Sequence, residues 1–126
     1  MKINIDAIGI EFSFDAKLSG TKKVNFYRKL YGYRSYSFYG KYTYIKEGVL
    51  SNIKYIKPAK SIIIVSIKDS KELRNFFKKH GVAFDERIVV LDEKDAKTLG
   101  LNYIEGWKKI YERIKENPDN SFYLDF

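Results

Sequence analysis

Tyrosine is interleaved with lysine and arginine through residues 17–60, and these side chains together have the chemistry to bind a polyanion. Lysine and arginine neutralise phosphates and release counterions, which gives affinity independent of base sequence. Exposed tyrosine rings can stack on the bases of a single strand, and each stacked base contributes roughly 1–3 kcal/mol. The segment holds 11 basic residues against one acidic residue, Glu47, so its net charge is +10. It is therefore the first candidate for a binding surface.

The alternation of aromatic and polar residues over 33–47 predicts one or two strands, with Gly40 as a bulge or turn, and places Tyr42 and Tyr44 on one face. We expect phosphate contacts from seven basic side chains: Lys22, Lys23, Arg28, Lys29, Arg34, Lys41 and Lys46. We expect base stacking from four rings: Tyr36, Tyr39, Tyr42 and Tyr44. Arginines are few, which disfavours dense bidentate reading of base edges. RNA or single-stranded DNA is therefore the predicted partner, rather than a duplex sequence.

Two other interpretations fit the same residues. Strand tyrosines commonly pack in a core with their hydroxyls at its edge, while lysines are solvated surface. A basic face can also bind an acidic protein, as part of a protein-interaction subunit, or a membrane surface. No zinc-finger, KH, RNP or P-loop pattern is present, so the nucleic-acid hypothesis rests on composition and clustering.

Asp92 and Lys94 follow the apolar run IVVL in the D-x-K spacing of metal-dependent nucleases. Such a site needs clustered carboxylates for Mg²⁺ and a lysine to hold the attacking water. Asp85 or Asp69 could supply the second carboxylate, but Asp85 lies at the start of the same strand, some 20 Å away. Asp92 equally suits the N-terminus of a helix. We favour that helix cap and keep the nuclease as the alternative function.

His80 is the only histidine, and the chain has no cysteine. The lack of cysteine excludes disulfides, thiolate metal sites and cysteine nucleophiles. His80 falls in the last turn of a predicted helix, where a cation is favoured, so we do not assign it as a general base. With 11 tyrosines in the chain, an enzyme that uses a tyrosine nucleophile is formally possible. We predict no catalytic residue, no metal site and no cofactor.

The whole net charge of +8 lies in residues 1–60, because residues 61–126 hold 12 bases and 12 acids. A length of 126 residues predicts one domain, and 44% apolar with 17% aromatic residues argue against disorder. We divide this domain into a basic tyrosine-rich half (1–60), a balanced scaffold (61–116) and an aromatic tail (117–126). The scaffold could also carry the interface of a homodimer. The absence of glutamine and the many charges resemble a thermophile-like composition.

No apolar run is long enough for a transmembrane helix, and the first twelve residues do not resemble a secretory signal. We therefore expect a cytoplasmic protein without a membrane partner. The tail could dock on a protein such as a sliding clamp, but it lacks the expected glutamine, so we expect it to pack back on the domain.

Local patterns predict the elements that position these residues. Residues 2–14 read as strand, with a change of phase beside Gly9 that suggests a bulge or two short strands joined by a turn. A helix is expected between Ser19 and Gly32, the strands of 33–47 follow, and residues 48–60 look irregular. The continuous apolar run 61–67 predicts a buried strand.

A capping box of Asp69 and Glu72 predicts a helix over 70–80, and a strand follows over 87–91. Asp92 and Asn102 are expected to cap two further helices, the second ending at Pro118. Together these elements predict an α/β or α+β fold: a single domain with a mixed β-sheet, a C-terminal βαβ unit and three or four helices.

Overall fold

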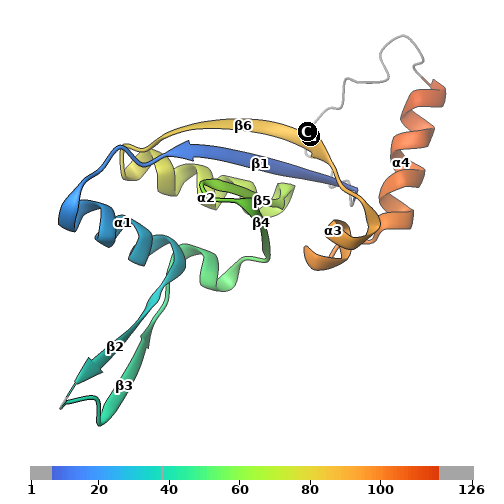
Figure 1. The fold of residues 1–126 in the computed structure, drawn as a ribbon. Helices are drawn as coiled ribbons and strands as arrows, with labels where there is room; N and C mark the ends of the chain where they lie inside the picture. The colour runs from blue at the N-terminus through green and yellow to red at the C-terminus, as the bar shows by residue number, and fades with distance from the viewer. Residues whose placement is uncertain (1–6, 38, 117–126) are drawn as a thin grey trace.

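The structure, a computed structural model of the 126-residue chain, describes residues 7–37 and 39–116. This part contains a four-stranded sheet, a two-stranded sheet, four α-helices and a short 3-10 helix (Figure 1). The elements in chain order are β1 (Ile8–Asp15), α1 (Gly20–Tyr31), β2 (Tyr33–Ser37), β3 (Tyr42–Lys46), η1 (Val49–Asn52), β4 (Tyr55–Ala59), β5 (Ile62–Ser66), α2 (Ile67–Lys79), β6 (Ala83–Val90), α3 (Glu93–Thr98) and α4 (Tyr103–Glu116). The expected class of mixed helix and strand is confirmed.

The four-stranded sheet has the order β4-β5-β1-β6, and each neighbouring pair is antiparallel. Because β5 and β6 are both antiparallel to β1, they run parallel to each other, and α2 connects them. The predicted βαβ unit is therefore present in split form, with β1 between its strands. The expected mixed pairing is not found among the described strands, since β1 separates the two parallel ones.

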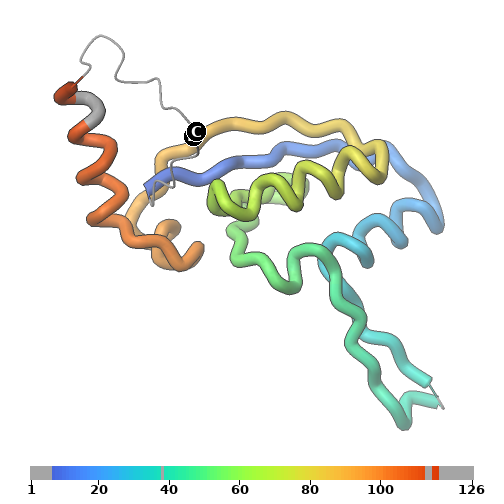
Figure 2. Tube along the Cα trace, turned by 180° about the vertical axis from the view of Figure 1, so that it is seen from behind, coloured from blue at the N-terminus to red at the C-terminus, as the bar shows by residue number. Residues whose placement is uncertain are grey.

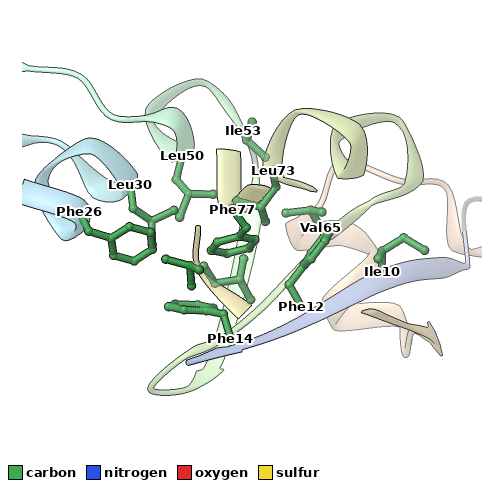
Figure 3. Packing of buried hydrophobic residues seen from close by; sticks show 12 residues of the cluster. Ile10, Phe12, Phe14, Phe26, Leu30, Leu50, Ile53, Val65, Leu73 and Phe77 are labelled. Carbon is green, nitrogen blue, oxygen red and sulfur yellow. The ribbon is translucent and has the colours of Figure 1, made fainter. Parts of the chain in front are cut away.

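The main core lies on the face of the sheet that α1 and α2 cover. β1 alternates with period two, which sends Ile10, Phe12 and Phe14 to this face. The ring of Phe77 on α2 lies 5.8 Å from Phe12 and 4.9 Å from Phe14, measured between centroids. Figure 3 labels ten residues of this cluster: Ile10, Phe12, Phe14, Phe26, Leu30, Leu50, Ile53, Val65, Leu73 and Phe77.

The opposite face of the sheet is covered in part by α3. Ala96 of α3 is fully buried in a cluster with Ile64 of β5. Helix α4 meets the start of β1 through Ile110, which packs with Ala7 and Ile8. None of the helices within residues 7–37 and 39–116 has the length and apolar character needed to cross a membrane.

Three predicted helix ends are confirmed. The Asp92 carboxylate accepts a hydrogen bond from the Asp95 N–H at 2.8 Å and caps α3. The Asn102 side chain accepts from the Glu105 N–H at 3.1 Å at the start of α4. Gly32 ends α1 in the left-handed region (φ 82°), and its N–H donates to the Arg28 carbonyl.

The N-terminal end of α2 differs from the prediction. The helix begins at Ile67, directly after Ser66, whose hydroxyl donates to the Asp69 carboxylate at 3.1 Å. Asp69 therefore lies inside the first turn, where its negative charge interacts favourably with the helix dipole. Ser66, and not Asp69, is the N-cap residue.

Three strand predictions also need correction. β1 passes through Gly9 without a bulge or turn. A Cβ at this position would lie 3.0 Å from Ile64 and 3.2 Å from Leu91. Glycine at this position allows close packing instead. β4 occupies part of the stretch expected to be irregular, and β6 begins at Ala83, four residues before its predicted start. The predictions for residues 1–6, for Pro118 and for the tail 117–126 lie outside the described residues.

β2 and β3 form a hairpin that leaves the body of the protein beyond the end of α1 (Figures 1 and 2). Gly40 lies in its turn with a φ of 84°, as the sequence predicted. The basic tyrosine-rich segment therefore includes a projecting two-stranded ribbon.

Candidate nucleic-acid interface

The hairpin exposes its tyrosines to solvent. All five residues of β3 are exposed. Tyr36, Tyr42 and Tyr44 keep 63%, 46% and 52% of their surface accessible. The core interpretation is therefore wrong for these rings. It holds for Tyr27, Tyr31 and Tyr55, which are partly buried against the main core.

The pairing register divides the hairpin into two faces. Tyr33 lies opposite Lys46, Ser35 opposite Tyr44 and Ser37 opposite Tyr42. Paired residues share a face, so one face carries these six side chains. The other face carries Arg34, Tyr36, Thr43 and Ile45. The structure thus brings Tyr42 and Tyr44 together, as predicted, and separates them from Tyr36.

Small residues lie across from the two rings of β3. Tyr42 faces Ser37 and Tyr44 faces Ser35, and a serine is too short to cover an aromatic ring. Both rings are exposed to solvent. Tyr33 on β2 completes the same face. It was not among the predicted stacking residues, although the register of a hairpin that turns at Gly40 places it there.

Helix α1 carries the other half of the basic segment. It buries Phe26 and Leu30 and exposes Lys22, Lys23 and Arg28. At 100° per residue, Lys22 and Lys29 lie close together on one side of the buried stripe, Lys23 lies on its other side, and Arg28 lies opposite the stripe. The four predicted cations of α1 are therefore not one cluster.

An open depression runs along the Lys23 side of α1. Its lining is Lys23, Val24, Tyr27, Arg28, Tyr31 and Gly32. The rings of Tyr27 and Tyr31 are parallel within 1°, with centroids 6.3 Å apart. The Lys57 ammonium lies 4.9 Å from the Tyr31 ring centroid. Burial raises the pKa of Tyr31, and the nearby Lys57 opposes this, so the phenol is neutral at physiological pH. Cations and flat rings thus meet in this depression.

Arg28 connects the depression to the hairpin. Its guanidinium carbon lies 4.6 Å from the centroid of the Tyr33 ring, a cation–π contact. Because Tyr33 shares a face with Tyr42 and Tyr44, the two regions form one surface. We call it the α1–hairpin surface, and its members are Lys23, Tyr27, Arg28, Tyr31, Tyr33, Tyr42, Tyr44 and Lys46.

Two glycines hold the neck of the hairpin against the body. Gly32 precedes β2 and Gly48 follows β3. A Cβ on Gly48 would lie 2.3 Å from the Gly32 nitrogen, and one on Gly32 would lie 2.6 Å from the Lys46 carbonyl oxygen. The two backbones can approach this closely only without side chains. This contact fixes how the hairpin leaves α1.

The turn holds two further predicted residues. Tyr39 is fully exposed with a φ of 56°, and Lys41 places its ammonium 5.8 Å from the centroid of the Tyr42 ring. Arg34 and Tyr36 lie on the opposite face of the ribbon. Phe38 is not among the described residues.

Asp92 and Lys94, the nuclease candidates, belong to the first turn of α3 and its cap. Asp92 is engaged in the cap hydrogen bond, and Asp85 lies near the far end of β6, as expected. Within residues 7–37 and 39–116, no three histidine, aspartate or glutamate side chains gather in a group that could hold a metal ion.

His80 is the C-cap of α2 and contacts two rings. Its centroid lies 4.5 Å from that of Phe76 and 6.1 Å from that of Phe26. Burial lowers the pKa of His80, and the charges of Lys29 and Lys79 lower it further. These surroundings disfavour the charged imidazole, whereas the sequence predicted a cation at this helix end.

Comparison with protein-family models, with curated proteins and with solved structures gave no match.

Proposed function

We propose that this protein binds RNA or single-stranded DNA through the α1–hairpin surface, by phosphate contacts and base stacking. The observation that carries the proposal is the projecting hairpin, whose Tyr33, Tyr42 and Tyr44 share one exposed face beside the cations of α1. An exposed aromatic cluster is costly to keep in water and is typical of a surface with a partner. A cytoplasmic location, expected from the sequence, belongs to the same proposal.

The spacing of the rings favours an unstacked strand. Tyr42 and Tyr44 are two residues apart on one strand, so their Cα atoms are separated by about 6.6–6.8 Å. Bases in a stacked strand follow each other every ~3.4 Å. Consecutive bases can therefore occupy both rings only if the strand is extended and its bases are separated from each other. A single strand reaches that conformation at low cost, whereas a duplex does not.

The cations supply the phosphate contacts. Lys23, Arg28 and Lys46 belong to the surface, and Lys41 borders Tyr42. Neutralising four phosphates of a single strand gives a slope of about −3 in log affinity against log salt. Raising salt from about 50 to about 200 mM should then weaken binding about 50-fold.

A two-stranded ribbon can also enter the major groove of a duplex. In that case arginine and amide side chains would be expected to reach the base edges. The hairpin carries one arginine, Arg34, and no asparagine or glutamine within 33–46. This composition favours stacking over groove reading.

The test is fluorescence anisotropy with labelled oligouridine, oligothymidine and a mixed-sequence duplex at the two salt concentrations. Binding to the single strands should be tighter than to the duplex. The double variant Tyr42→Ala/Tyr44→Ala should weaken it 10-fold or more, on the order of 1–3 kcal/mol per stacked base. Tyr111→Ala, which removes a still more exposed tyrosine on α4, is the control and should change nothing.

The same titrations separate the alternatives. Salt-sensitive binding that the tyrosine substitutions leave unchanged would indicate a general basic surface, such as one that binds acidic proteins. Preferred binding to the duplex would contradict the single-strand proposal. Cleavage in Mg²⁺ or Mn²⁺ that Asp92→Ala abolishes, with Lys97→Ala unchanged, would favour the nuclease.

A further inference from the structure

The two edges of the four-stranded sheet differ in how they are protected against pairing. Edge strand β4 has five residues, contains Lys57 and Pro58, and has an irregular register with β5 between Ile56 and Ala59. Proline, lysine and bulges are the usual devices that prevent an edge from pairing with another strand. β4 therefore has all three.

Edge strand β6 has none of these devices. Its eight residues pair with β1 in an unbroken register from Ala83 to Val90, and the strand contains no proline and no lysine. Its side chains Ile88 and Val90 are 55% and 60% exposed. β6 does carry the charged residues Asp85, Glu86 and Arg87, but a long and regular edge strand without proline or a bulge is still a template for a further strand.

One hydrogen bond identifies which backbone groups of β6 point away from β1. The Leu91 N–H donates to the Ala7 carbonyl at 2.8 Å, so odd-numbered residues of β6 bond to β1. The N–H and C=O groups of the even-numbered residues point away from β1. These residues are Phe84, Glu86, Ile88 and Val90.

We infer that β6 pairs with β6 of a second copy of this chain, antiparallel and centred on Glu86, so that a sheet of eight strands runs through a homodimer. A two-fold axis perpendicular to the sheet keeps the faces covered by α1 and α2 on the same side in both copies. In this register, Glu86 lies opposite Glu86 of the second copy, and residues one position before it lie opposite residues one position after it. Phe84 lies opposite Ile88 of the second copy, on the face of the sheet that α1 and α2 cover.

Charge selects this register. Asp85 lies opposite Arg87 of the second copy, twice by symmetry, in pairs without mutual hydrogen bonds, where Cα atoms lie only about 4.5 Å apart. Within the described chain, neither Asp85 nor Arg87 forms an ion pair of its own. The two Glu86 carboxylates meet at the axis, but each is already held by Arg74 of α2. A register centred on Arg87 would instead oppose two arginines, which lie across from Glu11 of β1 but, within the described residues, form no ion pair with it.

The first test is the molar mass of the full chain, measured by sedimentation over a range of concentrations. A dimer is expected. Ile88→Pro removes an outward N–H that β1 does not use, so it should yield a folded monomer with an unchanged circular dichroism spectrum. Pro58→Ala, on the opposite edge, is the control and should leave the dimer intact.

The second test exchanges the charges. Arg87→Asp alone and Asp85→Arg alone each oppose like charges at both positions, and each should weaken the dimer by about tenfold or more. Mixing the two variants restores opposite charges, so a heterodimer should form with affinity close to that of the original protein. The double variant Asp85→Arg/Arg87→Asp should again dimerise with itself.

Three results would overturn the inference. One is a monomer at every concentration. Another is a dimer insensitive to Ile88→Pro and to the charge exchange, which would place the interface elsewhere. The third is a chain shortened to residues 1–116 that dimerises while the full chain does not, which would mean that residues 117–126 occupy the edge. None of these measurements involves nucleic acid, so they leave the proposed binding function to its own test.

Discussion

Arg28 and Tyr33 are in cation–π contact across the junction of α1 and β2, with 4.6 Å between the guanidinium carbon and the ring centroid. Gly32, the end of α1, is the only residue between the helix and the strand. The contact therefore couples the direction of the projecting hairpin to the basic side of α1. It makes a depression on a helix and a row of tyrosines on a ribbon into one continuous surface.

The substitution Arg28→Lys tests this coupling while keeping the charge. A lysine cannot stack its charge flat on the Tyr33 ring, so about 0.5–1 kcal/mol of local stabilisation should be lost. Amide exchange should become faster in residues 33–46, and oligouridine binding should weaken with little change in salt slope. Arg34→Lys, on the opposite face of the ribbon, is the matched control. Equal effects of the two substitutions would show that the contact has no special role.

Gly48→Ala tests the neck of the hairpin. The φ of Gly48 is −105°, which alanine adopts freely, so its cost comes only from the 2.3 Å approach to the Gly32 nitrogen. We expect a loss of about 1–3 kcal/mol in unfolding free energy, as for other overpacked sites, measured by urea denaturation.

The control is Gly40→Ala at the tip of the hairpin. A Cβ there meets no atom within 4 Å, and only the left-handed conformation is penalised, by about 1–2 kcal/mol. Chemical shifts around Leu30 and Lys46 should therefore change in Gly48→Ala and stay unchanged in Gly40→Ala. The reverse pattern would contradict the assigned role of the neck.

Substitutions in the core should lower the free energy of unfolding, whereas substitutions of the hairpin tyrosines should leave it nearly unchanged. Phe77→Ala removes a fully buried ring at the centre of the main core and should cost about 3–5 kcal/mol of unfolding free energy. Tyr44→Ala removes a ring with no core beneath it and should change that free energy by less than about 0.5 kcal/mol. Thermal denaturation measures both. A large loss in Tyr44→Ala would mean that the ribbon tyrosines serve the fold.

His80 predicts a pH dependence of stability. Its pKa is lowered in the folded state by burial against rings and by Lys29 and Lys79, so the unfolded chain binds the proton more tightly. Its contribution to stability is therefore complete above the unfolded pKa of about 6.5 and is lost as pH falls through the lower folded pKa.

His80→Gln removes this titration. Urea denaturation at about pH 7.5 and pH 5 should show a smaller loss of stability on acidification in the variant than in the original protein. Asn75→Gln, an exposed position on the same helix, is the control. An equal loss in all three proteins would contradict the assigned shift.

Local signals predicted much of this fold. The caps at Asp92 and Asn102, the end of α1 at Gly32 and the turn at Gly40 are each decided by a few neighbouring residues, and all are found. β4 was not predicted because Lys57 and Pro58, which protect an edge, also weaken the strand pattern. The split of the βαβ unit depends on β1, whose residues lie 49 to 57 positions in sequence from their partners in β5, from Ser13↔Ile62 to Gly9↔Ser66. No local pattern contains that pairing.

The candidate site shows the same division. The alternation of side chains along a strand predicted that Tyr42 and Tyr44 share one face, but it does not predict whether another part of the protein covers that face. The contact of Arg28 with Tyr33 depends on the angle between α1 and the hairpin. The backbone approach of Gly32 and Gly48 sets that angle, so this contact could not be predicted from residue spacing alone.

The most direct test of the central claim is the response of the tyrosine rings themselves to a bound strand. Ring-labelled tyrosines are observed by NMR while short oligouridine is added at low salt. Ring currents from stacked bases should shift the signals of Tyr42 and Tyr44 strongly, with Tyr33 next, while Tyr36 and Tyr111 stay nearly unchanged. Shifts of equal size on all exposed tyrosines, or shifts confined to Tyr36 or Tyr111, would contradict binding at the α1–hairpin surface.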